Sequence, residues 1–175
     1  MADQKGPRYT VALSAIALLI FLPMLIEAAR AARNERAQKA RGGVEPQDDV
    51  YPVMRVVYPV AFLAMLAEGA VRGAASSSVL TAGVVVFAAA KVVKWSAILA
   101  LGPSWTFRVI VVPGDRRVAT GPYRYLRHPN YVGVVGELAG AALMMGALVS
   151  GPLGILMFGA LLRKRIAVEE RALKI

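Results

Sequence analysis

Runs of apolar residues, each bounded by charged or turn-forming residues, restrict what this chain can fold into more than any other feature of its sequence. The first run, residues 9–29, is long enough to cross about 30 Å of hydrocarbon as a helix. With 57% hydrophobic and 18% charged residues, the chain is too apolar for an ordinary soluble domain. The pattern predicts an all-α integral membrane protein with about five membrane-inserted helices, from the apolar runs at residues 9–29, 53–70, 79–101, 130–149 and 153–162.

The polar segments between these runs indicate how the helices connect. The first half of residues 30–50 predicts an amphipathic helix that lies along the membrane interface. Asn34 and Glu35 on this helix either face a cytoplasmic pocket or are solvated. The sequence Ser150-Gly151-Pro152 predicts a sharp break after the fourth run. We therefore expect residues 130–168 to form a helical hairpin within one compact domain.

Positive charge is concentrated beside the apolar runs, and the formal net charge is +10. Basic residues are not interleaved with aromatic residues on a polar surface, so the charge favours anionic membrane lipids over nucleic acid as a partner. Basic clusters follow the first run, precede the fourth and follow the fifth. Because basic loops are retained in the cytoplasm, we expect all three clusters on that side and the N-terminus outside. With no cysteine and one histidine, the chain is not expected to bind a metal.

The entrance to the fourth run, residues 121–137, gathers side chains that can carry chemistry. Pro129 suits the first turn of a helix, where its missing N–H needs no partner, so His128 is expected at or near the N-cap. The free N–H groups of a helix start favour an anionic ligand, and Arg124 and Arg127 add positive charge beside them. The alternative is an interfacial anchor, because aromatic and basic residues gather at membrane surfaces anyway.

Two further features lie inside the fourth run, an acid and a stripe of glycines. An acid within a membrane span, here Glu137, indicates either a functional site or a buried ion pair. The partner in such a pair would be Lys91 or Lys94, which we otherwise expect near the lipid headgroups. The glycines indicate either close helix packing or room for a cofactor. They are Gly133, Gly136 and Gly140.

Two adjacent acids, Glu169 and Glu170, follow the fifth run. They lie four residues from Arg165 and Lys174 respectively, so a solvated helix end with its own ion pairs is one interpretation. The other is a carboxylate that receives an ammonium group or steadies a sulfonium cation. Adjacent residues on a helix point about 100° apart, so we expect only one of the two acids to face such a site.

Together these residues resemble a known signature. The sequence Arg127-His128-Pro129-Asn130-Tyr131-Val132-Gly133, followed by the paired acids after a helical hairpin, resembles the RHPxYxG…EE motif of the isoprenylcysteine carboxyl methyltransferase family and its relatives, the phospholipid N-methyltransferases. The resemblance covers about residues 100–172. Residues 33–45 and 101–126 resemble, in addition, the small bacterial members associated with type III polyketide synthases, which O-methylate alkylpyrones or alkylresorcinols.

The resemblance implies S-adenosylmethionine as cofactor and a lipophilic substrate that enters from a bacterial cytoplasmic membrane, with the site facing the cytoplasm. The methyl acceptor would be an oxygen of a carboxylate, enol or phenol. Residues 1–100 would supply transmembrane helices and the interfacial segment, and residues 101–175 the cofactor-binding and catalytic region. The alternatives are a phospholipid N-methyltransferase, a non-catalytic membrane subunit and a reductase of the sterol-reductase fold.

The same resemblance implies a set of site residues. The methionyl carboxylate of the cofactor would meet a basic residue at the entrance to the fourth helix, and its amino group would meet one of the paired acids. The residues expected to bind the cofactor are Arg124, Tyr125, Arg127, His128, Pro129, Tyr131, Gly133, Glu169 and Glu170. The residues expected to take part in catalysis are His128, Glu137, Glu169 and Glu170.

Overall fold

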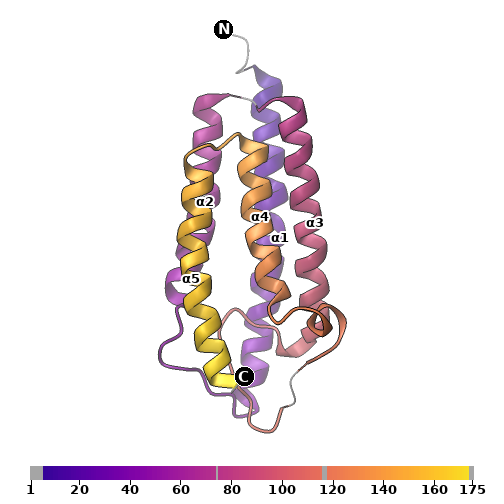
Figure 1. Ribbon diagram of the computed structural model, residues 1–175, viewed down its shortest axis with the longest axis vertical. Helices are drawn as coiled ribbons and strands as arrows, with labels where there is room; N and C mark the ends of the chain where they lie inside the picture. Colours follow the sequence, from indigo (N-terminus) through magenta and orange to yellow (C-terminus); the bar gives the residue numbers. More distant parts are fainter. Residues whose placement is uncertain (1–5, 74, 116–117, 174–175) are drawn as a thin grey trace.

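Five α-helices make up most of the computed structural model, which describes residues 6–73, 75–115 and 118–173 (Figure 1). Two short 3-10 helices, η2 (Gly102–Ser104) and η3 (Gly121–Arg124), lie in the long connection between the third and fourth α-helices. The predicted all-α fold class is confirmed. The α-helices are α1 (Pro7–Ala40), α2 (Tyr51–Arg72), α3 (Ser77–Leu101), α4 (Pro129–Met145) and α5 (Ser150–Leu173).

The helices run side by side, and their connections give the bundle two different ends (Figure 1). The α2–α3 and α4–α5 connections lie at the end near the N-terminus. The α1–α2 and α3–α4 connections and the last turns of α5 lie at the other end, which we call the polar end (residues 36–50, 102–115, 118–128 and 163–173). The three basic clusters therefore share one end, as predicted. Arg116, Arg117 and Lys174, with the predicted Glu170–Lys174 pair, lie outside the described residues.

Helix α1 is longer than expected. It is continuous from Pro7 to Ala40, with Pro23 in its interior, so the prediction of a separate interfacial helix after residue 29 is wrong. The physical reason is that its last turns find partners within the protein. The side-chain amide of Asn34 is buried and donates to the carbonyl oxygens of Gly102 at 3.0 Å and Trp105 at 2.8 Å. Asn34 thereby anchors the α3–α4 connection and does not face solvent.

The turn between α4 and α5 comes earlier than predicted. Helix α4 ends at Met145, and Gly146 follows in the left-handed conformation (φ +59°), which lacks a steric penalty for glycine. Helix α5 begins at Ser150, so the Ser-Gly-Pro sequence opens a helix and does not break one. The carboxylate of Glu68 caps this start by accepting the Ser150 N–H at 2.7 Å and hydroxyl at 2.6 Å. The predicted hairpin itself is confirmed.

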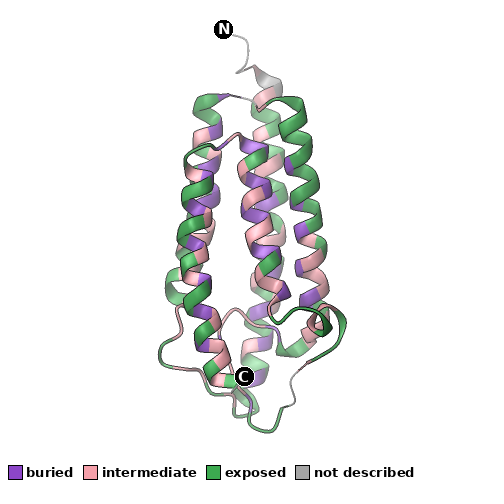
Figure 2. Cartoon of the chain, viewed as in Figure 1, coloured by how far each residue is buried: buried purple, intermediate pink, exposed green. Residues whose placement is uncertain are grey.

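Three helices, α1, α2 and α3, are long and apolar enough to cross a membrane. Helix α4 packs along α3, and α5 packs against α2 and α4. The outer faces of the bundle are largely exposed (Figure 2). Large apolar side chains on these faces include Leu18, Leu22, Leu25, Val85, Val92 and Leu156. Such surfaces suit a multi-pass protein in lipid, and insertion of all five helices stays a prediction.

Helices α3 and α4 approach closely because α4 presents its glycines to α3. A Cβ atom added at Gly133, Gly136 or Gly140 would lie closer to atoms of α3 than real side chains essentially ever come. The stripe is therefore used for helix packing, which confirms that interpretation. An added Cβ atom would lie 2.7 Å from Lys94 at Gly133, 2.7 Å from Ala90 at Gly136 and 2.6 Å from Phe87 at Gly140.

Four charged residues form a cluster inside the bundle, which we call the buried charge cluster: Glu27 of α1, Lys91 and Lys94 of α3, and Glu137 of α4. The Lys94 ammonium, 3% exposed, donates to Glu27 at 2.6 Å and to Glu137 at 3.1 Å. Lys91 pairs with the same acids at 3.1 and 2.9 Å, and the Tyr58 hydroxyl donates to Glu137. The two lysines do not extend outward to lipid headgroups as expected, because two acids inside the bundle neutralise them. Their depth in the membrane stays a prediction. The buried-pair interpretation of Glu137 is confirmed.

Candidate active site

The N-terminus of α4 carries the first half of the site. Pro129 lies in the first turn and His128 is the N-cap residue, as predicted. The His128 side chain makes no capping hydrogen bond, so its ring is available to other partners. The ring stacks on that of Tyr131, with centroids 5.5 Å apart and an interplanar angle of 17°. This stacking orients both side chains toward α5.

Two acids on α5 supply the second half. The Tyr131 hydroxyl donates to Glu169 Oε2 at 2.7 Å. The His128 ring lies 3.3 Å from Glu170 Oε1 through Nε2 and 3.7 Å from Glu169 Oε2 through Nδ1. Arg127 lies 3.8 Å from Glu170. The structure thus brings the entrance of α4 and the paired acids together. Both acids contact the His128 ring, and only one of them, Glu169, lines the cavity described below, as expected for adjacent residues of a helix.

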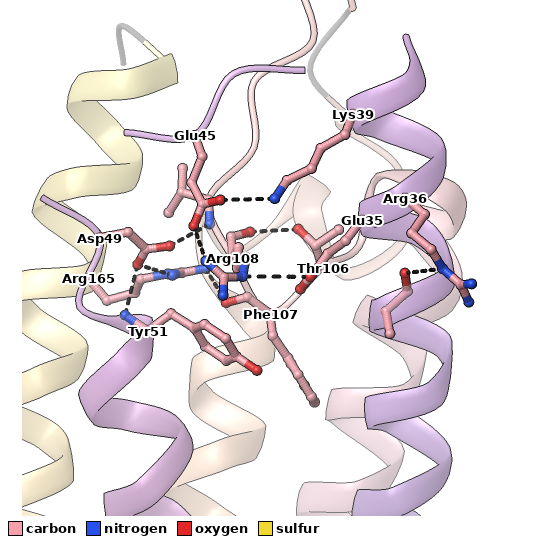
Figure 3. Close-up of polar contacts among 12 residues, drawn as sticks. Glu35, Arg36, Lys39, Glu45, Asp49, Tyr51, Thr106, Phe107, Arg108 and Arg165 are labelled. Carbon is pink, nitrogen blue, oxygen red and sulfur yellow. Dashed lines mark hydrogen bonds and ion pairs between the residues drawn. The ribbon is translucent and has the colours of Figure 1, made fainter. Parts of the chain in front are cut away.

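Arg165, one turn before Glu169 on α5, joins the site to the N-terminal half of the chain (Figure 3). Its guanidinium forms an ion pair with Asp49 and donates to the carbonyl oxygen of Phe107 at 2.6 Å. The Nε–H group donates to the Tyr131 hydroxyl at 3.3 Å. The interpretation in which Arg165 pairs with Glu169 is therefore wrong, because Asp49 takes the guanidinium.

Residues 41–50, the strap between α1 and α2, contribute a second set of ion pairs beside the site (Figure 3). Glu45 accepts a hydrogen bond from Arg108 and pairs with Lys39 at 3.2 Å. Burial by itself raises the pKa of Glu45, but the hydrogen bonds from the two basic residues outweigh it and hold the pKa below its ordinary value. The Arg108 guanidinium also lies over the Tyr51 ring, 5.1 Å from its centroid. The strap is thus tied to the α3–α4 connection.

A cavity of about 680 Å³ joins the site to the interior of the bundle. This volume falls within the usual range of ligand pockets, about 300–1,000 Å³. The cavity has a charged head at the polar end and a mostly apolar body, which Glu27 and Lys94 of the buried charge cluster also line. Charged and polar residues at its head include Tyr123, Arg127, His128, Tyr131 and Glu169, and apolar residues deeper in the bundle include Met24, Met54, Val134 and Phe158.

Two polar groups at the head of the cavity are available to a ligand. Among the described residues, the buried side-chain oxygen of Asn130 has no hydrogen-bond partner. Burial, and after it the negative charge of Glu169, raise the pKa of Tyr123, so its hydroxyl stays protonated. The head of the cavity thus offers an acceptor and a donor besides its charged groups.

Residues 81–175 match the family model of the isoprenylcysteine carboxyl methyltransferase (ICMT) family. The chain belongs to this family. YpbQ, an uncharacterized protein of Bacillus subtilis (strain 168), is 32% identical over 91% of this chain and 94% of its own length. An uncharacterized protein of Haemophilus influenzae (strain Rd) is 23% identical over 81% of this chain and 83% of its own length. No solved structure matches the chain.

ICMT membership implies a membrane methyltransferase that uses S-adenosylmethionine. Both relatives are uncharacterized, so neither names a methyl acceptor or links the chain to polyketide enzymes. The matched region begins in α3 and includes α4 and α5, so it contains the whole signature. It leaves out the strap and Asp49.

Some residues predicted from the ICMT signature do not line the cavity. Tyr125 is 81% exposed, and the guanidinium of Arg124 lies over its ring. Gly133 faces α3, and Glu137 belongs to the buried charge cluster. Pro129 is buried at the start of α4, and Glu170 contacts His128 beside the cavity. The predicted residues that do line it are Arg127, His128, Tyr131 and Glu169.

Three further residues of the site, Asn130, Asp49 and Arg165, were not predicted from the sequence. Asn130 occupies the variable position of the signature, and its place in the first turn of α4 was a usable signal. Asp49 lies in a stretch that indicates only a turn, and its partner Arg165 is 116 residues away. Arg165 was noted only for its spacing from Glu169. No local sequence pattern could have linked Asp49 to Arg165.

Proposed function

We propose that this ICMT-family protein transfers a methyl group from S-adenosylmethionine to an oxygen of a lipophilic substrate, a carboxylate, enol or phenol. The observation that carries the proposal is the cavity, which is charged at the polar end and mostly apolar toward the middle of the bundle, where Glu27 and Lys94 are its charged lining residues. A charged cofactor and a lipophilic acceptor need two such environments side by side.

The residues at the head of the cavity fit the charges of the cofactor. Arg127 and the N-terminus of α4 favour its carboxylate, and Glu169 and Glu170 favour its ammonium or sulfonium group. The unpartnered oxygen of Asn130 can accept a hydrogen bond from a ligand N–H group. When bound there, S-adenosylmethionine supplies a methyl group activated by the sulfonium.

The protein's own contribution is alignment of the reacting atoms and exclusion of water. The stacked rings of His128 and Tyr131 form a rigid wall, and Tyr131 fixes one carboxylate oxygen of Glu169. The transfer neutralises charge, so the partly dry cavity favours it. An acceptor carboxylate or acidic enol needs no base, whereas the proton of a phenol would pass to His128 or a glutamate.

The acceptor enters sideways from the bilayer, between α1 and α2. Leu25 of α1 and Arg55 of α2 both line the cavity and are exposed on the outside of the bundle. The guanidinium of Arg55 favours an acidic amphiphile, such as an alkylpyrone or alkylresorcinol, over a phospholipid amine. The basic clusters support an orientation in which the polar end faces the cytoplasm of a bacterial cell.

Titration of the purified protein with S-adenosylhomocysteine tests the cofactor assignment. We expect binding in the micromolar range, and its absence would reject the proposal in favour of a non-catalytic membrane subunit. His128→Ala and Glu170→Ala should lose methyl transfer. Arg72→Ala, an exposed change at the opposite end of the bundle, is the matched control and should keep it.

Mass spectrometry of bacterial lipid extracts, incubated with the protein and isotopically labelled S-adenosylmethionine, tests the acceptor. A labelled ester, enol ether or aryl ether supports the proposal. A labelled phospholipid amine would assign the protein to the phospholipid N-methyltransferases instead.

A further inference from the structure

We infer that Asp49 is a positioning residue of the active site, supplied by the N-terminal half of the chain. It holds Arg165, and through Arg165 it keeps the carboxylate of Glu169 free for the cofactor. The inference rests on the proposed function, because the state of Glu169 matters only if the site binds S-adenosylmethionine. Asp49 lies outside residues 81–175, which match the family model.

Asp49 is held rigidly on the strap. Its side chain is 3% exposed and accepts three hydrogen bonds. One oxygen accepts from the Arg165 guanidinium and from the backbone N–H of Tyr51 at 3.0 Å, and the other accepts from the N–H of Val109 at 2.9 Å. Because its three hydrogen-bond donors come from three different segments of the chain, the Asp49 carboxylate has one available orientation. It therefore provides a fixed anchor for a cation.

Arg165 transmits this orientation to α4. Its side chain is 6% exposed, and the planar guanidinium points away from its own helix toward the strap (Figure 3). With one nitrogen paired to Asp49 and a second bonded to the Phe107 carbonyl, Nε–H lies within 3.3 Å of the Tyr131 hydroxyl. Because the guanidinium is planar and rigid, fixing one edge of it at Asp49 also fixes the position of Nε–H beside Tyr131.

The chain of contacts ends at Glu169. Because the Tyr131 hydroxyl oxygen accepts from Arg165, its proton is directed to Glu169 Oε2, 2.7 Å away. Glu169 also lies four residues after Arg165 on α5, the spacing at which an acid and an arginine pair. Without Asp49, the nearest acid in helical spacing to the freed guanidinium is Glu169. Asp49 thus prevents an internal ion pair that would cancel the charge needed by the cofactor.

The test measures binding of S-adenosylhomocysteine to the full-length protein in detergent, together with KM, kcat and the unfolding temperature. We expect Asp49→Asn to weaken binding and raise KM for S-adenosylmethionine by roughly tenfold, with a smaller change in kcat. Asp49→Glu, which keeps the charge, should recover part of the loss. Asp48→Asn is the matched control, because it breaks only the exposed Asp48–Arg171 pair beside it on the strap.

A double-mutant cycle separates positioning from general stability. If Asp49 acts through Arg165, Asp49→Asn should not weaken binding further in an Arg165→Met background. A loss of similar size in both backgrounds would overturn the inference. The Arg165→Met comparison also decides the matter should the single Asp49→Asn protein not fold, because the double variant buries no unpaired charge from this pair.

The failures of the two proposals are distinguishable. A wild-type protein that does not bind S-adenosylhomocysteine would overturn the proposed function. A wild-type protein that binds it, with equal affinity in Asp49→Asn, would overturn only the role of Asp49.

Discussion

The buried charge cluster and the cluster at the candidate active site (His128, Tyr131, Glu169 and Glu170) both join acids and bases from different helices. They differ in how far their acids are exposed. In the buried cluster, Glu137 is 2% exposed, and two acids face two lysines with balanced charge. At the polar end, the side chains of Glu169 and Glu170 are 29% and 31% exposed beside the cavity. The same residue type therefore locks helices together in one place and remains available to a ligand in the other.

This difference teaches how to read an acid in an apolar helix. Glu137 attracted attention as a candidate catalytic group because charge inside a membrane is unfavourable. Its partners on α2 and α3 account for it as a structural element. Glu169 could be either an ordinary helix-end acid or a residue of the site, and it lines the cavity. What separates the structural role of Glu137 from the proposed ligand-binding role of Glu169 is whether the acid is fully paired within the protein, and not its depth in the membrane.

The largest expected effect is on the stability of the bundle. Glu137→Gln leaves two buried lysines with one acid, and we expect it to destabilise the protein by about 3–5 kcal/mol. Thermal unfolding in detergent measures this change. The double variant Glu137→Gln/Lys91→Met restores neutrality and should recover much of the loss. An unchanged unfolding temperature of Glu137→Gln would contradict the structural role of Glu137.

Glu169→Gln is the matching change at the polar end, where we expect a large loss of activity and a small loss of stability. The amide keeps the size of the side chain but removes the charge that meets the cofactor, so methyl transfer should fall by roughly 100-fold or more. The unfolding temperature should move by only a few degrees. Activity assays and thermal unfolding of the same preparations check this, and a folded variant with full activity would contradict it.

Both clusters depend on the spacing of α3 and α4, because α4 carries Glu137 and Tyr131. A Cβ atom at Gly140 would lie 2.6 Å from the Phe87 backbone nitrogen, so Gly140→Ala should destabilise the protein by about 1–3 kcal/mol. Gly159→Ala on α5 is the control, since its Cβ would meet nothing within 4 Å. Equal unfolding temperatures for the two variants would refute close packing as the reason for the stripe.

The smallest expected effect concerns the strap. The folded pKa of Glu45 is lowered, so its stabilising ion pairs are complete above the unfolded carboxyl pKa of about 4.5 and are lost as the pH falls through the folded value. Its partly exposed pairs should contribute at most about 1 kcal/mol. Wild type and Glu45→Gln should therefore differ in unfolding temperature at pH 7 and converge in acid. A gap that widened in acid would show the sign to be wrong.

Features that depend on neighbouring residues could be predicted from local sequence. Apolar runs longer than the bilayer core predict membrane helices, and Pro129 after His128 predicts the start of α4. The glycine stripe predicts a close helix contact. The ICMT signature named Arg127, His128, Tyr131 and Glu169, which the fold places together on the cavity wall.

The partners of most charged side chains follow from the tertiary fold. Helical spacing offered Glu169 to Arg165, and Lys94 was expected either at the headgroups or beside Glu137. Lys94 does pair with Glu137, but its shorter contact is to Glu27, 67 residues away, and Arg165 pairs with Asp49, 116 residues away. Ion pairing follows distance in space and the cost of leaving a buried charge unpaired, and neither is written in local sequence.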